Sequence, residues 1–357
     1  MKLVKIKLGE LESFCSSETF RKFEIKPISP LRMKSYKANP RAKEEDAVLY
    51  MLIENEKLIA FRTILPDTVY TEDNTPIRFG WCSGIWVHPE YRGKKLWKPL
   101  LEEALKDWED KLMLTNYAPK TLFLYIREDW FHTLSDRQGY RFYLNPDFKE
   151  ILQERISNPV VKPLLSLANR MAALIYNIKK IILPSFNRIQ IEELNRLDKE
   201  CINLIHYYSD FSLFKREEKE IDWIMEYPWI TEENSPEFHY PFSYSNIKHK
   251  TNVVKYYVKN HFAGFFIYSI LNRKMKILYY YEKPGLLSSI SIPIVKIAKA
   301  NKISHLTILS PLLSETVKIL SKHFLFTKHY QSDIYSTFSV NIDGRTIFDG
   351  DGDNSFT

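Results

Sequence analysis

The spacing of apolar residues in the first half of the chain predicts three strands followed by a helix. Residues 47–54 and 58–65 are apolar runs separated by a short polar turn, which is the pattern of a β-hairpin. Residues 78–87 predict a third strand. Over residues 96–112 the apolar side chains lie three, four or one apart, so they fall on one face of an α-helix.

The pattern continues with shorter elements. Residues 121–126 are an apolar run that predicts a fourth strand. Residues 130–137 predict a short helix, and Gly139 follows its end, because glycine accepts the left-handed conformation of a helix C-terminus. A last strand begins at residues 140–144. This half therefore has the element order of an α+β domain with a mixed sheet.

The second half repeats this order of elements. Helices are predicted at 189–208, 218–225, 287–299 and 313–323, and strands at 253–258, 262–270, 274–281, 306–309 and 334–338. Repetition of one element order predicts a duplicated domain. We expect domains at 1–150 and 189–340, with a helical linker at 151–188 and a C-terminal tail at 341–357.

The bulk composition is that of a globular protein. The chain has 357 residues, more than one hydrophobic core usually supports, of which 45% are hydrophobic and 27% charged. Its net charge of +7 suits an anionic ligand but is too small for this length to indicate nucleic acid. Cys15, Cys82 and Cys201 are isolated, so we expect neither disulfides nor a zinc site, and a cytoplasmic location fits best.

Residues 160–184 form a long apolar segment. Basic and amide side chains interrupt it, which predicts an amphipathic or buried helix between the domains and not a membrane span. Peripheral contact of its basic end with a membrane surface stays open as an alternative.

The tail contains an acidic run at residues 348–354, which resembles the opening of a calcium loop. The run lacks the glutamate that belongs at the twelfth position of such a loop. This departure favours a solvated acidic tail and no bound metal.

The segment from Val87 to Trp97 combines a strand end, a turn and a helix start. Pro89 cannot donate to the strand ladder, and Arg92 and Gly93 begin a turn. The first N–H groups of the following helix have no partner within the helix, so they attract an anion. Full positive charges surround the turn on Arg92, Lys94, Lys95 and Lys98. The turn therefore predicts a site for a phosphate or pyrophosphate group.

This segment resembles the GCN5-related N-acetyltransferase (GNAT) superfamily. The likeness rests on Val87-x-Pro89-x-Tyr91-Arg92-Gly93, followed by an amphipathic helix, a strand and a short helix ending at Gly139-Tyr140. It covers residues 47–144, and the second half resembles another copy of the same fold. The resemblance implies two GNAT-like domains in tandem, each a twisted, mostly antiparallel sheet flanked by helices. Residues 279–285 of the second copy bring no arginine to the turn, so that copy is interpreted as degenerate.

The resemblance implies that the first copy binds acetyl-CoA, or another acyl-CoA, as co-substrate. The turn would hold the pyrophosphate, and the backbone of the preceding strand would pair with the pantetheine arm. Lys95 and Trp97 stand where the family pattern has small residues. The residues implied in cofactor binding are Ile85, Trp86 and Val87 on the strand and Arg92, Gly93, Lys94, Lys95, Leu96 and Trp97 at the turn.

Proton transfer and acceptor binding need further side chains. Many relatives have a tyrosine acid four residues before a Gly-Phe or Gly-Tyr pair, and Ser135 stands at that place before Gly139. His132 and Glu128 are the titratable alternatives. For the acceptor, Arg32 and Tyr36 lie four apart on a segment that walls the substrate site in relatives.

These observations predict an acyl-CoA-dependent N-acyltransferase that moves an acyl group to the primary amine of a small molecule or peptide by direct attack. Two alternatives stay open. Some tandem GNAT proteins transfer amino acids from aminoacyl-tRNA, and a third class binds acyl-CoA without catalysis. The Arg-Gly turn favours coenzyme A.

Overall fold

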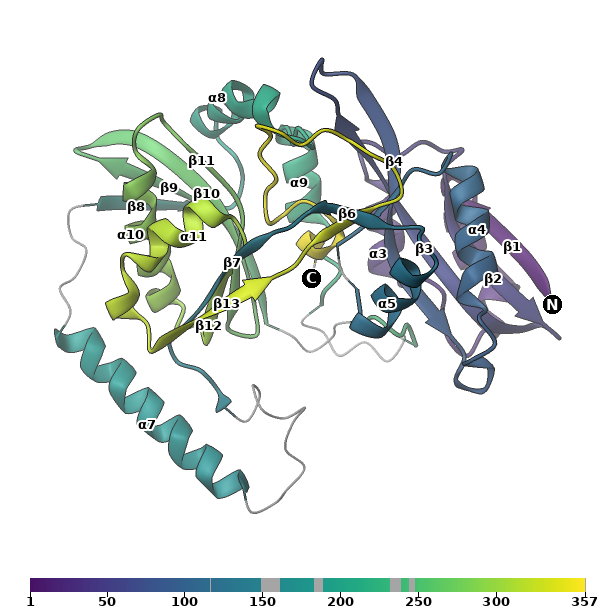
Figure 1. Cartoon of the computed structure of the whole chain (residues 1–357), viewed down its shortest axis with the longest axis horizontal. Helices are drawn as coiled ribbons and strands as arrows, with labels where there is room; N and C mark the ends of the chain where they lie inside the picture. The colour runs from purple at the N-terminus through teal and green to yellow at the C-terminus, as the bar shows by residue number, and fades with distance from the viewer. Residues whose placement is uncertain (116, 149–160, 183–188, 232–238, 244–247, 357) are drawn as a thin grey trace.

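The computed structural model of the chain describes residues 1–115, 117–148, 161–182, 189–231, 239–243 and 248–356. It contains two seven-stranded mixed sheets flanked by helices, which confirms the predicted α+β class (Figure 1). The strand order is β1-β2-β3-β4-β5-β14-β6 in the first sheet and β8-β9-β10-β11-β12-β7-β13 in the second. The second sheet therefore repeats the order of the first.

The first sheet consists of β1 (Lys2–Lys7), β2 (Ala47–Glu54), β3 (Lys57–Tyr70), β4 (Pro76–Val87), β5 (Leu112–Leu114), β14 (Ile334–Ser336) and β6 (His132–Ser135). Neighbouring strands are antiparallel except β4 and β5, which run parallel. Its helices are α1 (Leu11–Ser16), α2 (Glu18–Lys22), α3 (Pro30–Lys37), α4 (Trp97–Asp107) and α5 (Pro119–Arg127).

The second sheet consists of β8 (Ile189–Leu194), β9 (His249–Val258), β10 (His261–Leu271), β11 (Lys274–Glu282), β12 (His305–Ile308), β7 (Gln138–Tyr143) and β13 (Phe326–Gln331). Here β11 and β12 form the parallel pair. Its helices are α8 (Lys199–Tyr208), α9 (Glu218–Glu226), α10 (Leu287–Ala300) and α11 (Pro311–Lys318).

The two halves exchange one strand each. β7, from the first half of the chain, lies between β12 and β13 in the second sheet. β14, from the second half of the chain, lies between β5 and β6 in the first sheet. Each sheet is thus completed by a strand from the other half. β7 and β14 therefore belong to the sheet formed mainly by the other half of the chain. The domain limits at 1–150 and 189–340 stay a prediction.

The hydrophobic core is continuous between the sheets. On one face of the first sheet, Leu100, Leu101 and Ala104 of α4 pack in a cluster of their own with residues of β2 and β3. On the opposite face, Trp81 of β4 belongs to the same buried cluster as Tyr279 of β11. Because this face is shared, the second half walls the space beside β4.

The predicted elements between residues 112 and 137 are wrong. Residues 121–126, predicted as a strand, belong to α5, and residues 130–137, predicted as a helix, contain β6. Helix α4 ends early because Glu109 and Asp110 adopt positive φ angles of 52° and 56°, which leaves Leu112–Leu114 to form β5. Pro119 in the first turn of α5 is a helix-start signal that the strand interpretation overlooked.

Two predictions in the second half also need correction. Residues 189–208, predicted as one helix, form strand β8 and helix α8. Asp198 separates them, because its side chain accepts a hydrogen bond from the N–H of Cys201 and so caps α8. Strand β13 was not predicted, and the closing strand of the second half joins the first sheet as β14.

The predicted linker helix is α7 (Val161–Ile182), which projects from the second sheet (Figure 1). Ala172 and Tyr176 are buried on one side, and an apolar stripe is exposed on the other, formed by Leu164, Leu167, Met171, Leu174 and Ile178. Within the described parts of the chain, no helix combines the length and apolar character that crossing a membrane requires.

The acidic tail, predicted to be solvated, is buried, so that prediction is wrong. Asp349, Asp351 and Asp353 are at most 9% exposed, and the C-terminus lies between the two sheets (Figure 1). Partners from distant parts of the chain compensate their burial: Arg216 pairs with Asp351 at 3.2 Å, and the Thr115 hydroxyl donates to Asp353 at 2.9 Å. Those partners are separated from the tail by more than 100 residues, so local sequence does not reveal them.

Candidate active site

The first sheet opens between β4 and β5. The two strands pair only where Gly80 and Trp81 lie beside Leu112 and Met113. β4 then continues to Val87 while β5 ends at Leu114, so the strands diverge. Beyond Trp81, no strand among the described residues lies beside the edge of β4 that faces β5.

A bulge in β4 lies at the opening. Thr63 of β3 pairs with Gly84, whereas the next residue, Ile64, pairs with Cys82, so Ser83 is the extra residue. Ser83 is held by Arg32, whose guanidinium donates to the Ser83 carbonyl at 3.3 Å and to its hydroxyl at 3.0 Å. The bulge therefore places Ser83 and Cys82 at the start of the divergence.

A cavity of about 190 Å³ occupies this opening. Residues from both faces of the sheet line it, and they include Arg62, Cys82 and Tyr125 on the side of α5 and Arg32, Ser83 and Phe242 on the side of the second half. A space that reaches both faces at a point where two strands separate can admit one reactant from each side.

Tyr125 and Arg62 form a buried pair in this cavity. Tyr125 on α5 is 2% exposed and Arg62 on β3 is 1% exposed, and the Arg62 guanidinium donates a hydrogen bond to the Tyr125 hydroxyl. Burial raises the pKa of Tyr125, while the positive charge of Arg62 acts in the opposite direction. The hydroxyl thus keeps its proton near neutral pH and can give it to a stronger base formed in the cavity.

Tyr125 was missed by the sequence interpretation, although it carries a recognisable signal. It stands four residues before Asp129, whose φ of 58° is the left-handed conformation that glycine usually supplies, and Trp130 follows as the aromatic residue. Asp129-Trp130 is therefore the pair that ends the helix before β6. The glycine in Gly139-Tyr140 lies one element later, in β7.

The structure brings none of the three predicted catalytic residues into the cavity. Ser135 and His132 lie on β6, where they pair with Ile334 and Ser336 of β14, and His132 is exposed. Glu128 forms an ion pair with Lys98 at 2.7 Å, which lowers the pKa of Glu128. The reason for choosing Ser135 fails, because that residue lies in a strand and not on the helix that carries the tyrosine.

The predicted anion turn has the backbone that close approach requires. Gly93 has a φ of +86° and no atom within 4 Å of the position its Cβ would take, and Lys95 has a φ of 55°. Arg92, Gly93, Lys94 and Lys95 are exposed, while Leu96 and Trp97 are buried. The Trp97 ring packs against Tyr125 and Trp130, with ring centroids 5.4 and 5.8 Å away, so only its backbone remains for an anion.

The strand before the turn presents one edge to the opening. Ile85, Trp86 and Val87 pair with β3 on one edge through Arg62, Phe61 and Ala60. Their other edge faces the opening, so its N–H and C=O groups are available to an extended ligand.

The predicted acceptor residues lie on α3, at the cavity or next to it. Arg32 lines it, and Tyr36 lies beside Thr63, Ser83 and the Arg32 side chain. Both are buried, at 4% and 0% exposure. The Arg32 guanidinium lies over the Trp229 ring at 3.8 Å, so the second half supplies part of this wall.

A family model described as an acetyltransferase (GNAT) domain matches residues 17–127, which include α3, the β4 opening, the turn and Tyr125. This region is similar to GNAT acetyltransferase domains. No curated protein matches the chain.

Solved structures similar to this chain cover nearly its whole length at low identity. A GCN5-related N-acetyltransferase from Anabaena variabilis is 11% identical, with 94% of this chain and 72% of that chain covered and a TM-score of 0.49. A probable N-acyltransferase from Enterococcus faecalis is 12% identical, with 96% and 73% covered and a TM-score of 0.48. A GCN5-related N-acetyltransferase from Kribbella flavida is 12% identical, with 93% and 71% covered and a TM-score of 0.47.

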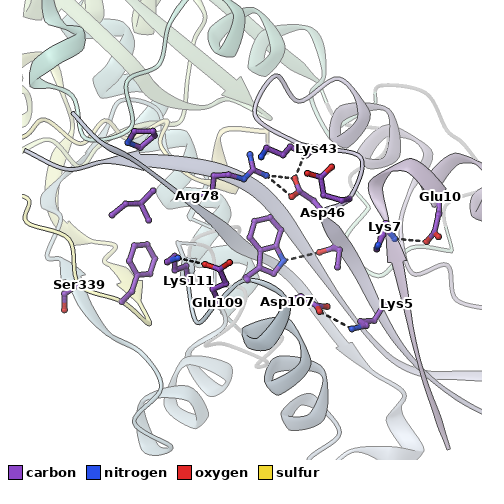
Figure 2. A pocket seen from close by; sticks show the side chains of 16 residues that line it. Lys5, Lys7, Glu10, Lys43, Asp46, Arg78, Asp107, Glu109, Lys111 and Ser339 are labelled. Atoms are coloured by element: carbon purple, nitrogen blue, oxygen red, sulfur yellow. Dashed lines mark hydrogen bonds and ion pairs between the residues drawn. The ribbon is translucent and has the colours of Figure 1, made fainter. Parts of the chain in front are cut away.

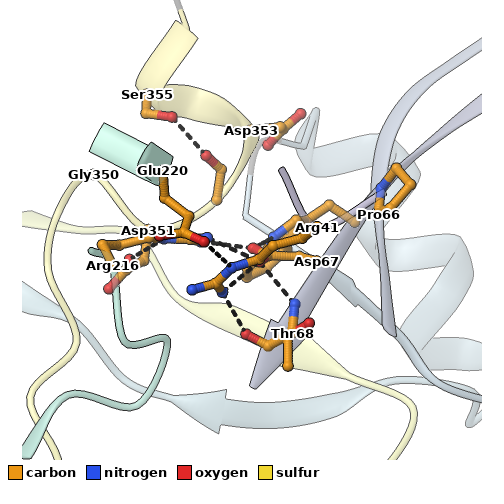
Figure 3. Close-up of polar contacts among 12 residues, drawn as sticks. Arg41, Pro66, Asp67, Thr68, Arg216, Glu220, Gly350, Asp351, Asp353 and Ser355 are labelled. Carbon is orange, nitrogen blue, oxygen red and sulfur yellow. Dashed lines mark hydrogen bonds and ion pairs between the residues drawn. The ribbon is translucent and has the colours of Figure 1, made fainter. Parts of the chain in front are cut away.

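A network of buried charges joins the GNAT domain to the second half and the tail (Figure 3). Asp67 on β3 accepts two hydrogen bonds from Arg216, at 2.8 and 2.6 Å, and others from Arg41 at 2.9 Å and from the Trp81 indole at 2.7 Å. Burial alone would raise the pKa of Asp67, but Arg216 and Arg41 outweigh it and lower the pKa to about 2. Arg216 also reaches Asp351, so the same guanidinium holds the tail.

A larger hollow lies elsewhere, around the start of β4 and the end of α4 (Figure 2). Its volume is about 1090 Å³, and its charged residues are largely paired with each other. Arg78 bonds Asp46 at 2.8 Å, Lys5 bonds Asp107 at 3.1 Å and Lys111 bonds Glu109 at 2.8 Å. It has no bulge or turn of the GNAT type, so we place the candidate site at the β4–β5 opening.

Among the described residues, no group of three His, Cys, Asp or Glu side chains could hold a metal.

Proposed function

We propose that this chain is an acyl-CoA-dependent N-acyltransferase that acts on a primary amine. The observation that carries the proposal is the cavity between β4 and β5, which reaches both faces of the sheet and holds the buried Tyr125 hydroxyl. The GNAT domain match supports acyl transfer in general. The residues around the opening support the more specific proposal of an acyl-CoA donor and a primary-amine acceptor.

The residues of the turn and of β4 fit an acyl-CoA. The open edge of Ile85–Val87 would bond the pantetheine arm as a strand would, and the exposed Arg92–Lys95 turn would bind the pyrophosphate. An acyl-CoA supplies the thioester when it is bound. Lys98 contributes less than its position suggests, because Glu128 neutralises it.

Tyr125 is proposed as the general acid. An amine that attacks the thioester carbonyl forms a C–N bond, and the C–S bond then breaks to release a thiolate. Tyr125 would give its proton to that sulfur, and Arg62 would orient the hydroxyl throughout. Ser135, His132 and Glu128 are not proposed for this role, because they lie outside the cavity.

The test combines binding with turnover. Acetyl-CoA should raise the melting temperature, since a ligand that binds only the folded state stabilises it. Free thiol should then appear when primary amines are added. Binding without thiol release would favour a non-catalytic acyl-CoA-binding protein, and absence of both would contradict the proposal. Transfer of an amino acid from aminoacyl-tRNA, which releases no thiol, is the remaining alternative. The Arg92–Gly93 turn argues against it.

A further inference from the structure

The tail passes through the opening of the second sheet. β11 and β12 pair at Lys274–Lys276 and then diverge, as β4 and β5 do in the first sheet. The Gly350 N–H donates to the Leu278 carbonyl at 2.8 Å, and the Tyr279 hydroxyl donates to the Gly350 carbonyl at 2.8 Å. On the other side, the Leu309 N–H donates to the Asp349 carboxylate at 2.6 Å. The tail therefore occupies part of the space between β11 and β12.

The fit of the tail in the second opening is tight. A Cβ on Gly350 would lie 2.6 Å from the Tyr279 ring and 2.9 Å from the Leu278 carbonyl oxygen. The tail is thus packed closely against Leu278 and Tyr279, while a cavity of about 250 Å³ remains beside Tyr280–Glu282 at the end of β11.

Beyond the second opening, the tail continues to the first. Asp351 is fixed by Arg216, and Phe356 stacks on the Trp229 ring with centroids 4.6 Å apart. The Trp229 N–H donates to the Phe356 carbonyl at 3.0 Å. Asp353, between these two anchors, accepts a hydrogen bond at 2.9 Å from Thr115, the residue directly after β5.

Asp353 lies against the residues that line the active-site cavity. Arg32 acts on it through its charge and Ser83 through its hydroxyl. Both of these residues line the cavity, and Ser83 is the bulge residue of β4. The carboxylate thus lies next to the Arg32 and Ser83 side of the cavity, whereas Tyr125 lines the cavity from α5.

We propose that Asp353 is a catalytic residue that binds the acceptor ammonium and removes its proton, so that the buried tail completes the active site. This inference rests on the acyltransferase function proposed above. It assigns a role to the acidic run that neither the family match nor the cofactor residues explain.

The proton balance of the step requires two groups. A primary ammonium carries three N–H bonds, and the amide keeps one. One proton passes to the Asp353 carboxylate before the nitrogen attacks the thioester carbon. A second leaves the nitrogen after the C–N bond forms and replaces the proton that Tyr125 gives to the sulfur when the C–S bond breaks. Asp353 then releases its proton to solvent, so the net products are the amide, the thiol and one proton.

The surroundings define the class of acceptor. Among the described residues, the Arg32 Nε is buried without a hydrogen-bond partner, and the buried Tyr36 and Tyr240 hydroxyls interact with the Thr63 hydroxyl. Tyr36 and Tyr240 both lie close to Thr63 and to Asp353. Buried polar groups of this kind are ready to bond a ligand. The cavity of about 190 Å³ therefore suits a small polar primary amine, or the amine end of a longer one.

The charges around Asp353 favour a base that works near neutral pH. Burial raises the pKa of Asp353 to about 6, while Arg32, Thr115 and Ser83 act in the opposite direction. The other titratable groups that sense it are Tyr36, Tyr240, Cys82 and Lys276. A base with this pKa is ionised at pH 7 and still accepts a proton readily.

The test compares Asp353→Asn with the wild-type full chain. The probes are three primary amines of falling basicity, ethanolamine, glycinamide and aminoacetonitrile, with thiol release from acetyl-CoA as the readout. We expect kcat/KM for ethanolamine to fall about 10²- to 10⁴-fold at pH 7 in the variant, with the affinity for acetyl-CoA unchanged. The deficit should shrink for aminoacetonitrile, since this amine is already largely unprotonated. A purely structural role would lower all three rates equally.

A second variant keeps the proposal falsifiable if Asp353→Asn fails to fold. Thr115→Val removes only one hydrogen bond to the carboxylate, so the acid limb of the kcat/KM profile should move to higher pH. The inference would be overturned if the wild-type protein turns over amines and the kcat/KM of Asp353→Asn lies within threefold of the wild-type value. It would also be overturned if the pH profile of kcat/KM is the same in both variants as in the wild-type protein. Either result leaves the proposed function intact. If the wild-type protein turns over no amine, the proposed function fails and the inference with it.

Discussion

Arg62 of β3 donates a hydrogen bond to the hydroxyl of Tyr125 on α5, and both side chains are almost completely buried. The bond crosses the opening of the first sheet, where β4 and β5 have separated. A guanidinium held against a phenol in this position fixes the direction of the O–H group before any substrate arrives. The orientation of the proposed acid is thus built into the fold.

The first prediction concerns the anion turn. Gly93→Ala should strain the turn, because an alanine at a φ of +86° costs roughly 1–2 kcal/mol. We expect the Kd for acetyl-CoA to rise about tenfold, which corresponds to about 1.4 kcal/mol. Gly285→Ala is the matched control, since Gly285 has a φ of +81° and equally open surroundings in the second half. Calorimetric titration that gives the same Kd for both variants would place the cofactor elsewhere.

The second prediction concerns the buried network around Asp67. Asp67→Asn leaves Arg216 and Arg41 without their shared carboxylate, so the free energy of unfolding should fall by about 3–5 kcal/mol. Asp46→Asn removes a partly exposed partner of Arg78 and should cost about 1 kcal/mol or less. Denaturant unfolding measures both changes, and equal losses would contradict the network's role.

The pH dependence of the same variant is a separate prediction. The pKa of Asp67 is lowered from 3.8 to about 2 in the folded state, so its contribution is fully present above pH 4. The contribution is lost as the pH falls through the folded-state pKa. The stability difference between the wild-type protein and Asp67→Asn should therefore shrink between pH 4 and pH 2. A constant difference over this window would show that Asp67 does not act through its charge.

The fourth prediction concerns α7. Its exposed stripe and its basic residues, with no acidic residue in the helix, support the alternative of peripheral membrane contact. The wild-type protein should sediment with phosphatidylserine vesicles more than with phosphatidylcholine vesicles. Leu167→Glu with Leu174→Glu should abolish the difference, whereas Leu312→Glu, equally exposed on α11, should leave it unchanged. A wild-type protein that stays in solution with both vesicles would exclude this contact.

The strand pattern and the turn could be predicted because both depend on nearby residues. The hairpin of β2 and β3, strand β4 and the Arg92–Gly93 turn all follow from local periodicity and from proline and glycine positions. The arrangement of Arg32 and Tyr36 follows from helical spacing. These parts of the site need no information from the rest of the chain.

The remaining parts depend on distant contacts. Asp129 takes a left-handed conformation without being glycine, which hid the end of α5 and with it Tyr125. Asp353 looks like a solvated residue until Thr115, 238 positions earlier, is placed beside it. The exchange of β7 and β14 is invisible to local periodicity, because both strands have ordinary patterns and only their partners differ.

Thiol release from acetyl-CoA by the wild-type protein and by Tyr125→Phe, in the presence of ethanolamine, tests the account most directly. The phenylalanine keeps the packing against Trp97 and Phe131 but has no proton to give. We predict that kcat falls about 10²- to 10⁴-fold while acetyl-CoA still binds, and that Tyr207→Phe, an exposed tyrosine on α8, stays close to wild type. Equal rates for wild type and Tyr125→Phe would contradict the assignment of the β4–β5 opening as the site of acyl transfer.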